Sequence, residues 1–538
     1  MHVPAGDGRE VAAHSAGFWT NFVRRFLLCL FLFASAIISA CTTNKTYTKI
    51  PTWSEMESAQ AAIDALQLTD PATNGEIEGY ASAVSVNRGE DIKLFVNTKE
   101  PEYSIEVLRM GWYGGRGMKK MTPVIARKSV SQPLPILDAA TGMVECDWND
   151  PYVLHVPKSF EPVEWKSGIY IAKLTAGTSR KQSYIVFVVR DDERHSELLF
   201  QSSVTTYQAY NEWGGRSLYS NPRAFKVSFN RPYRRGHGTG DMLYWELSMV
   251  RFLEKEGYDV TYTTDVDTHA HGERLLSHKG FLSVGHDEYW TWQMMDNVEG
   301  ARDHGIHVAF FGSNPAYWQI RLEPSVITGE QNRTITCYKN ETADPVSHSD
   351  DPAMRRMTTV KFRSHPVDRP EDALVGVMYE SDPVQADIVV SDAGSWVFDG
   401  TGLKNGDILH DLLGYEVDKV SGHAPATIQR IAHSPYDFHG NTRYSDMTVY
   451  TAPSGSIVVA TGSMQWSWGL VDPEMEGKTY DNPAVKRATR NILLRFGARP
   501  ATDKIETAQE DRCCKQQLIS FQKKVARRPS KKSKKTAV

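Results

Sequence analysis

Cysteine is scarce in this chain, with 6 residues in 538. The cysteines stand at Cys29, Cys41, Cys146, Cys337, Cys513 and Cys514. This spacing matches neither a disulfide framework nor a structural zinc site. By contrast, apolar side chains are plentiful: 41% of the residues are hydrophobic and 10% are aromatic. That composition excludes wholesale disorder, and the length predicts about three structural units.

Several catalytic signatures are also missing. The sequence has no G-x-S-x-G elbow, no H-E-x-x-H, no C-x-x-C and no G-x-G-x-x-G after an expected strand. Gly477-Lys478-Thr479 resembles the end of a phosphate loop, but Asp472 stands where the first glycine is required. Any hydrolytic chemistry is therefore expected to use water activated by a metal ion or by a base.

Basic residues are few in the body of the chain. Residues 41–500 carry 47 basic and 59 acidic side chains, whereas residues 501–538 carry 11 basic and 4 acidic ones. A negatively charged body argues against nucleic acid as a partner. The basic tail, 501–538, is predicted to be disordered. It either keeps the chain soluble or adheres to anionic lipids or cell-envelope polymers.

The N-terminus has the pattern of a bacterial lipoprotein signal. Arg24 and Arg25 precede 13 mostly apolar residues, 26–38, which are too few for the roughly 20 that span a bilayer. Ile38-Ser39-Ala40-Cys41 resembles a lipobox. We expect a signal peptide at 1–40, lipid on Cys41, a tether at 41–75, and a place in the bacterial cell envelope. An uncleaved signal anchor or a misassigned start codon are the alternatives.

Residues 76–190 have a period of two. Ile92, Leu94 and Val96 alternate with more polar neighbours, and Gly114-Gly115 and Asn149-Asp150-Pro151 separate the short runs. This pattern favours an antiparallel, immunoglobulin-like β-sandwich.

Residues 196–500 alternate between strand and helix patterns, which is typical of a mostly parallel sheet covered on both faces. We expect strands at 198–203, 258–264, 279–284, 306–311 and 457–460. We expect helices at 242–256, 289–304 and 482–496. Ligands bind such sheets beyond the carboxyl ends of the strands, so the loops that begin at Thr205, Asp265, Gly285 and Gly312 are the candidate site.

Four motifs resemble one known family. They begin at Arg109 (RMGWYGG), Thr205 (TTYQAYN), Gly285 (GHDEYW) and Gln465 (QWSWG). In this order they are similar to the large, β subunit of N,N-dimethylformamidase and its relatives. The resemblance covers residues from about 76 to 497. It implies a class I glutamine-amidotransferase-like α/β domain beside the β-sandwich.

The resemblance also implies a mononuclear ferric iron held by two tyrosines and one glutamate. The matching positions are Tyr207 and Glu288, with Tyr170 as the second tyrosine. Hard oxygen donors of this kind suit a highly charged ion. If Ile169 and Ile171 point into the sandwich core, strand alternation turns Tyr170 outward, toward the next domain.

Three further positions match catalytic residues near the metal: His286, Asn314 and Glu416. His286 or Glu416 would move protons to the leaving amine, and Asn314 would steady the oxyanion or the substrate. Each position also has a structural alternative. Glu288 could cap the helix expected at 289–304, and His286 could be a hydrogen-bonding residue without a catalytic role. Tyr170 could be an interdomain packing residue.

Two other clusters of side chains stand out in the sequence. Asp265, Asp267, His269 and His271 stand at alternate positions and would share one face of an extended segment, where they could bind a divalent cation or form a solvated loop. Trp290, Trp318, Trp466 and Trp468 could line a small apolar pocket or belong to the core.

The sequence thus predicts a metal-dependent hydrolase of an amide C–N bond in a small molecule, anchored in the cell envelope. A non-catalytic surface lipoprotein that binds a glycan or a peptide is the alternative. Homo-oligomerisation and a small partner subunit both stay open. Because an exported lipoprotein does not resemble a cytoplasmic solvent-degrading enzyme, dimethylformamide itself is not the expected substrate.

Overall fold

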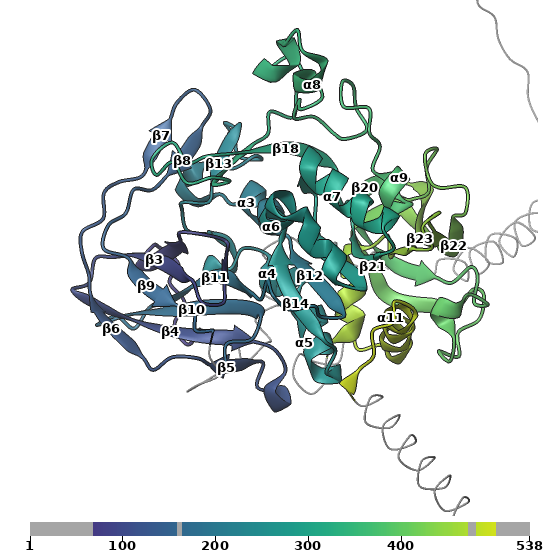
Figure 1. The fold of residues 1–538 in the computed structure, drawn as a ribbon, viewed down its shortest axis with the longest axis horizontal. Helices are drawn as coiled ribbons and strands as arrows, with labels where there is room; N and C mark the ends of the chain where they lie inside the picture. The colour runs from purple at the N-terminus through teal and green to yellow at the C-terminus, as the bar shows by residue number, and fades with distance from the viewer. Residues whose placement is uncertain (1–67, 159–163, 472–479, 502–538) are drawn as a thin grey trace, which may run out of the picture. The chain divides into compact units, whose positions relative to one another are not determined.

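The computed structural model describes residues 68–158, 164–471 and 480–501 (Figure 1). The expected signal peptide, Cys41, all of the tether before Leu68 and the basic tail from residue 502 lie outside the described residues, so the expectations for them stay predictions. Within the described ranges, every helix is too short or too polar to cross a lipid bilayer.

Two sheets form the N-terminal part. The first has the strand order β1-β3-β9, and the second has the order β2-β11-β10-β4-β5, with β6 also paired to β4. The strands of the first sheet are β1 (Ile77–Ala81), β3 (Asp91–Thr98) and β9 (Tyr152–His155). The strands of the second are β2 (Ser85–Asn87), β4 (Glu102–Met110), β5 (Met118–Lys120), β6 (Ile125–Lys128), β10 (Gly168–Ala176) and β11 (Gln182–Arg190). A hairpin of β7 (Ile136–Asp138) and β8 (Met143–Glu145) stands apart from both.

A shared hydrophobic core lies between these two sheets. Ile92, Leu94 and Val96 of β3 are buried in it and alternate with more exposed neighbours, as the period of two predicts. Strands β4, β10 and β11 contribute their inward-facing residues to the same core. The pairings are antiparallel except for β2 with β11.

The orientation of β10 is opposite to the one expected. Tyr170 points into the core between the two sheets, whereas Ile169 and Ile171 point out of it and pack with residues of the α/β part. Both faces of β10 are buried. Hydrophobicity therefore could not tell which face belongs to which core.

A seven-stranded sheet forms the centre of the α/β part, with the order β14-β12-β15-β17-β24-β23-β22. Its strands are β12 (Leu198–Ser202), β14 (Val260–Thr264), β15 (Gly280–His286), β17 (His307–Ser313), β22 (Gln429–Phe438), β23 (Asn441–Thr451) and β24 (Ile457–Ala460). The first five strands in this order pair in parallel, and β23 and β22 are added antiparallel.

Helices cover both faces of this sheet, as expected. On one face, Phe200 and Leu282 pack with α5 (Leu247–Glu256), with α11 (Pro483–Arg495) and with η7 (Met464–Leu470). On the other face, Phe281 and Phe310 pack with α7 (Trp292–Asp303) and α9 (Asp372–Val375). Consecutive strand residues thus enter different cores, which explains the continuous apolar runs in the sequence.

Two of the expected helices differ in detail. The helix expected at 242–256 is divided at Glu246 into α4 (Met242–Trp245) and α5. The helix expected at 289–304 begins at Trp292, because Tyr289–Thr291 form a short strand, β16, that pairs with β18 (Trp318–Glu323). The hydroxyl of Thr291 accepts a hydrogen bond from the Met294 backbone N–H and so caps α7.

The remaining elements are two small sheets and several short helices. A four-stranded sheet joins β13 (Lys226–Ser228), β19 (Thr334–Thr336), β18 and β16, and a two-stranded one joins β20 (Met378–Val389) and β21 (Ile408–Lys419). The short helices are α3 (Val204–Tyr210), α6 (Asp265–Ala270), α8 (Pro352–Arg355), η1 (Tyr113–Gly115), η2 (Trp213–Gly215), η3 (Arg235–Gly238), η4 (Gly272–Ser277), η5 (Pro345–His348) and η6 (Trp396–Phe398). The protein is therefore a mixed α/β structure in which strands predominate.

Candidate functional site

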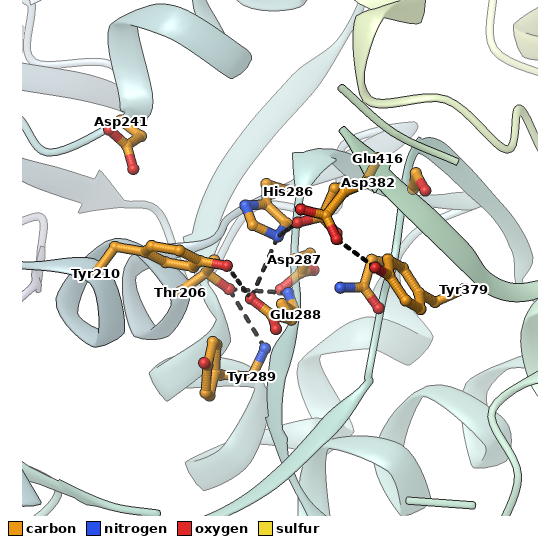
Figure 2. A network of polar contacts seen from close by, with 12 residues as sticks. Thr206, Tyr210, Asp241, His286, Asp287, Glu288, Tyr289, Tyr379, Asp382 and Glu416 are labelled. Atoms are coloured by element: carbon orange, nitrogen blue, oxygen red, sulfur yellow. Dashed lines mark hydrogen bonds and ion pairs between the residues drawn. The ribbon is translucent and has the colours of Figure 1, made fainter. Parts of the chain in front are cut away.

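The polar cluster at the end of β15 contains most of the predicted site. His286 is the last residue of this strand and Glu288 follows it, while Glu416 comes from β21 (Figure 2). Figure 2 shows the side chains of His286, Glu288 and Glu416 pointing toward one another. The carboxyl edge of the parallel sheet is where the strand pattern placed the ligand site.

Glu288 is held by two phenols. The hydroxyl of Tyr210 donates a hydrogen bond of 2.8 Å to Oε2, and the hydroxyl of Tyr219 donates one of 3.0 Å to Oε1. The backbone N–H of Glu288 donates to the hydroxyl of Thr206. Although the Glu288 side chain is only 3% exposed, Tyr219 as a whole residue is 44% exposed. The cluster is thus buried, with Tyr219 on its solvent side.

The imidazole of His286 lies between two carboxylates. Its Nε2 is 3.3 Å from Glu288 Oε2 and 3.5 Å from Glu416 Oε1. Burial alone would lower the pKa of His286, but the charges of Glu416 and Glu288 outweigh it and raise the pKa to about 10. The pKa of Glu416 is raised by burial and by the charge of Glu288. Burial also opposes the ionisation of Glu288, yet His286 and Lys339 bring its pKa below the ordinary value.

Asn314 stands next to this cluster on the loop after β17. Its backbone is in the left-handed region, with φ of 55°, and its N–H donates to Asp418 Oδ1 at 2.9 Å. The neighbouring Ser313 hydroxyl donates to the same carboxylate. Burial raises the pKa of Asp418 to about 7. A carboxylate from β21 therefore holds the loop in a conformation that few residues other than glycine adopt.

Two buried polar atoms in this region have no hydrogen-bond partner within the described part of the chain. They are Oδ1 of Asn314 and Oε2 of Glu416. A buried polar group without a partner costs about 1–3 kcal/mol. Since these atoms come from two of the predicted site residues, they indicate a site for a polar ligand.

Tyr207 and Tyr170 do not join Glu288. The Tyr207 hydroxyl donates a 2.5 Å hydrogen bond to Glu246 Oε1, in a buried network with Ser202. The Tyr170 hydroxyl donates to the backbone carbonyl of Lys166 at 2.6 Å, and its ring stacks between Trp165 and Phe187. The expected convergence of Tyr170, Tyr207 and Glu288 is therefore wrong, and Tyr170 is a core residue of the two-sheet part.

Sequence reasoning missed two tyrosines of the site. Tyr210 belongs to the same TTYQAYN motif as Tyr207, three residues later on α3. Residues three apart on a helix point in directions that differ by about 60°, so only the position of the helix decides which phenol reaches Glu288. Tyr219 follows α3 and η2 and lies outside the quoted motifs. No pattern in the sequence indicated it.

The structure also decides against two alternatives that the sequence left open. Glu288 is not a helix cap, because α7 begins four residues later and is capped by Thr291. The cluster at Asp265 is not a metal site: residues 265–270 are helical, and side chains two apart on a helix point to opposite sides. Asp267 caps this helix together with Thr264. Among the described residues no group of three His, Cys, Asp or Glu side chains could hold a metal ion.

The four tryptophans do not line one pocket. Trp466 and Trp468 belong to one core and Trp290 to the core on the opposite face of the sheet. Trp290 also donates its indole N–H to Asp287. Trp318, at the start of β18, is only half-buried and lies beside Lys339, whose Nζ is 4.9 Å from the ring centroid.

Two other proteins match part of this chain. The N,N-dimethylformamidase beta subunit of Paracoccus aminophilus is 23% identical over 341 residues, which are 57% of this chain and 43% of that protein. The chain thus aligns with less than half the length of this relative. A family 123 glycoside hydrolase from Clostridium perfringens matches with a TM-score of 0.10 and 9% identity, over 51% of this chain and 53% of that one. A match at this level carries no argument about fold or function.

A sequence model of one family matches residues 104–482. This range holds about two thirds of the chain and includes every residue of the cluster around Glu288. It begins within β4 and continues to the residue that caps α11. The chain therefore belongs to the N,N-dimethylformamidase beta subunit-like, C-terminal family.

Proposed function

We propose that this protein is a metal-dependent hydrolase of amide C–N bonds in small molecules. One observation carries the proposal: Tyr210, Tyr219 and Glu288 meet at hydrogen-bond distance, beside two unpartnered polar atoms, Oδ1 of Asn314 and Oε2 of Glu416. The membership in a family named after an amide-hydrolysing enzyme supports the same reaction class. We further propose that the two-sheet part is immunoglobulin-like and that the α/β part is amidotransferase-like.

The donor set fits a hard cation such as ferric iron. Two phenol oxygens and one carboxylate are oxygen ligands of the kind such an ion prefers. Burial and the charge of Glu288 raise the pKa of Tyr210 and Tyr219 well above 10, so both phenols are neutral donors to Glu288. A bound cation would reverse this, because its charge favours the phenolates. Tyr210, Tyr219 and Glu288 would then hold the ion, in place of the set that includes Tyr170 and Tyr207.

The ion would supply Lewis-acid polarisation of the amide carbonyl and of a water molecule. The other residues would handle the protons and the substrate. His286, which lies between Glu288 and Glu416, would donate a proton to the leaving amine nitrogen. Glu416 would take up a proton from the attacking water, since its carboxylate has an unpartnered oxygen. Asn314 would bind the substrate through the side-chain amide.

The experiment compares the full chain with the Glu288→Gln variant. We expect the wild-type protein to contain near-stoichiometric iron with a visible phenolate-to-iron absorption, and to release formate from simple N-formyl amines. Glu288→Gln should lose iron and hydrolysis together. A colourless, metal-free wild-type protein that hydrolyses no amide and binds cell-wall glycan or peptide fragments would contradict the proposal and support a non-catalytic binding protein.

We also propose that lipid on Cys41 holds the protein at the cell envelope, with the substrate reaching it there. The proposal rests on the lipobox pattern of residues 38–41. The Cys41→Ser variant should leave the membrane fraction, and continued membrane attachment would mean a different anchor. A small partner subunit is proposed from the relative, which is named as a beta subunit. Co-purification from the native cell would test it.

A further inference from the structure

A row of aromatic rings and amines begins at the cluster and leads away from it. The Tyr219 hydroxyl contacts Glu288, and the Nζ of Lys339 lies 3.4 Å from the centroid of the Tyr219 ring. The same amine is 4.9 Å from the centroid of Trp318. Lys339 therefore stands one side chain away from Glu288, beside Tyr219, a residue that is 44% exposed.

The row continues with a second lysine. The Nζ of Lys361 lies 5.8 Å from the centroid of Trp318 and 4.9 Å from the centroid of Tyr317. The rings of Tyr317 and Trp318 are in edge contact, 5.2 Å apart. Lys361 and Trp318 are also bridged through their backbones. Both ammonium groups thus lie against the ring of Trp318. We call Lys339, Trp318 and Lys361 the lysine strip.

Neither lysine forms a close ion pair with a residue that the structure describes, although Glu288 acts on Lys339 and Glu371 acts on Lys361 at longer range. No carboxylate lies within 4.0 Å of either Nζ, although both side chains are half-buried. Arg363 differs, because it pairs with the buried Glu371. Partly burying a cation without a close opposite charge is unfavourable, whereas an anion that contacts these amines would compensate them.

We propose that the lysine strip binds a negatively charged group of the substrate. This inference rests on the proposed function: the substrate is then an amide whose carbonyl lies at Glu288 and whose other end bears a carboxylate. N-acyl amino acids are the simplest members of this class. The ring of Trp318 offers an apolar surface for the part of the substrate between its two polar ends.

The charges disfavour the other substrate classes. A cationic amide would be repelled by the two ammonium groups. A neutral amide such as dimethylformamide would give neither lysine a close ion pair. The carboxylates of the cluster act on Lys339 only from a distance, because Glu288 accepts hydrogen bonds from two phenols and both glutamates face His286.

The test uses two probes that differ in one charge, N-formyl-L-phenylalanine and its methyl ester. Binding to the full chain is measured by calorimetry at low salt, and hydrolysis is measured as released formate. We expect the acid to bind about tenfold more tightly than the ester, because a hydrogen bond to a charged group is worth about 1.5–3 kcal/mol. High salt should reduce this preference.

Variants assign the preference to the strip. Lys361→Met should reduce the acid-to-ester ratio to near one, and Lys361→Arg should restore most of it. Lys128→Met serves as the matched control, because Lys128 is exposed on β6 of the N-terminal part and carries the same charge. It should keep the wild-type ratio. Equal binding of the two probes by the wild type would overturn the inference.

The two proposals can fail separately. If the acid binds preferentially, depends on Lys361 and yields no formate in iron-loaded protein, the lysine strip is supported and the hydrolase proposal fails. If both probes are hydrolysed equally and Lys361→Met changes nothing, the hydrolase is supported and the lysine strip is refuted.

Discussion

Two tyrosines of one motif allow a sharp test of the metal site. Tyr207 and Tyr210 stand three residues apart on α3, and each phenol donates to a buried glutamate. Only Tyr210 reaches Glu288. The variants Tyr207→Phe and Tyr210→Phe therefore remove the same atom from the same helix, and they differ in whether that atom belongs to the proposed metal site.

The structure predicts opposite effects of these variants on iron. Tyr210→Phe removes one of three proposed oxygen ligands. Loss of an outer hydrogen-bond partner already lowers metal affinity by about 10–100-fold, so we expect a decrease of more than about 100-fold here. Tyr207→Phe should keep the iron. It leaves Glu246 without its phenol donor, which should cost about 1–3 kcal/mol of unfolding free energy.

Iron per chain is measured by elemental analysis, the phenolate absorption by visible spectroscopy, and stability by urea unfolding. The wild type and both variants are purified and loaded with iron in parallel. If Tyr207→Phe loses iron while Tyr210→Phe keeps it, the ligand set drawn from the family resemblance is right. The reasoning from the hydrogen bonds to Glu288 is then refuted.

Three further predictions concern stability, each measured by urea unfolding. Burial raises the pKa of Glu246 from 4.5 to about 8, so between these pH values the native state binds more protons than the unfolded state. The contribution of Glu246 to the free energy of unfolding is therefore complete below pH 4.5 and is lost as the pH rises through 8. Glu246→Gln should flatten this dependence, and an unchanged profile would contradict it. Arg109 joins β4 to Glu254 of α5 through a 2.6 Å ion pair. The Arg109→Met variant should lose about 3 kcal/mol of unfolding free energy. An unchanged unfolding free energy would mean that the pair is dispensable. Gly238 has φ of 110° and a Cβ there would meet a backbone carbonyl of β11, so Gly238→Ala should cost more than about 2 kcal/mol. Gly440→Ala, with positive φ and open space, should cost only about 1 kcal/mol.

Much of the fold could be predicted from local patterns. The parallel strands of the α/β part were expected within one to two residues of most of their ends, because each is a short apolar run between polar loops. The start of α7 was wrong by three residues. Tyr289–Thr291 pair with β18, and the sequence around Tyr289 contains no signal for that distant partner.

The site was predicted in part. His286, Glu288 and Glu416 are brought together as expected, although 128 positions separate Glu288 from Glu416. The prediction that Tyr170 and Tyr207 join Glu288 was wrong. A strand with two buried faces, β10, has no hydrophobic signal for its orientation, and so Tyr170 was placed on the wrong side.

The sequence by itself determined the class of the protein and the place of its chemistry: alternating patterns predict the two kinds of sheet, and polar residues after strands predict the rim where ligands bind. Only the tertiary structure decided which side chains meet there. Periodicity shows which residues of a segment share one face. Packing between segments far apart in the chain decides the rest: how α3 is rotated, which face of β10 meets which core, and that Tyr219 reaches Glu288.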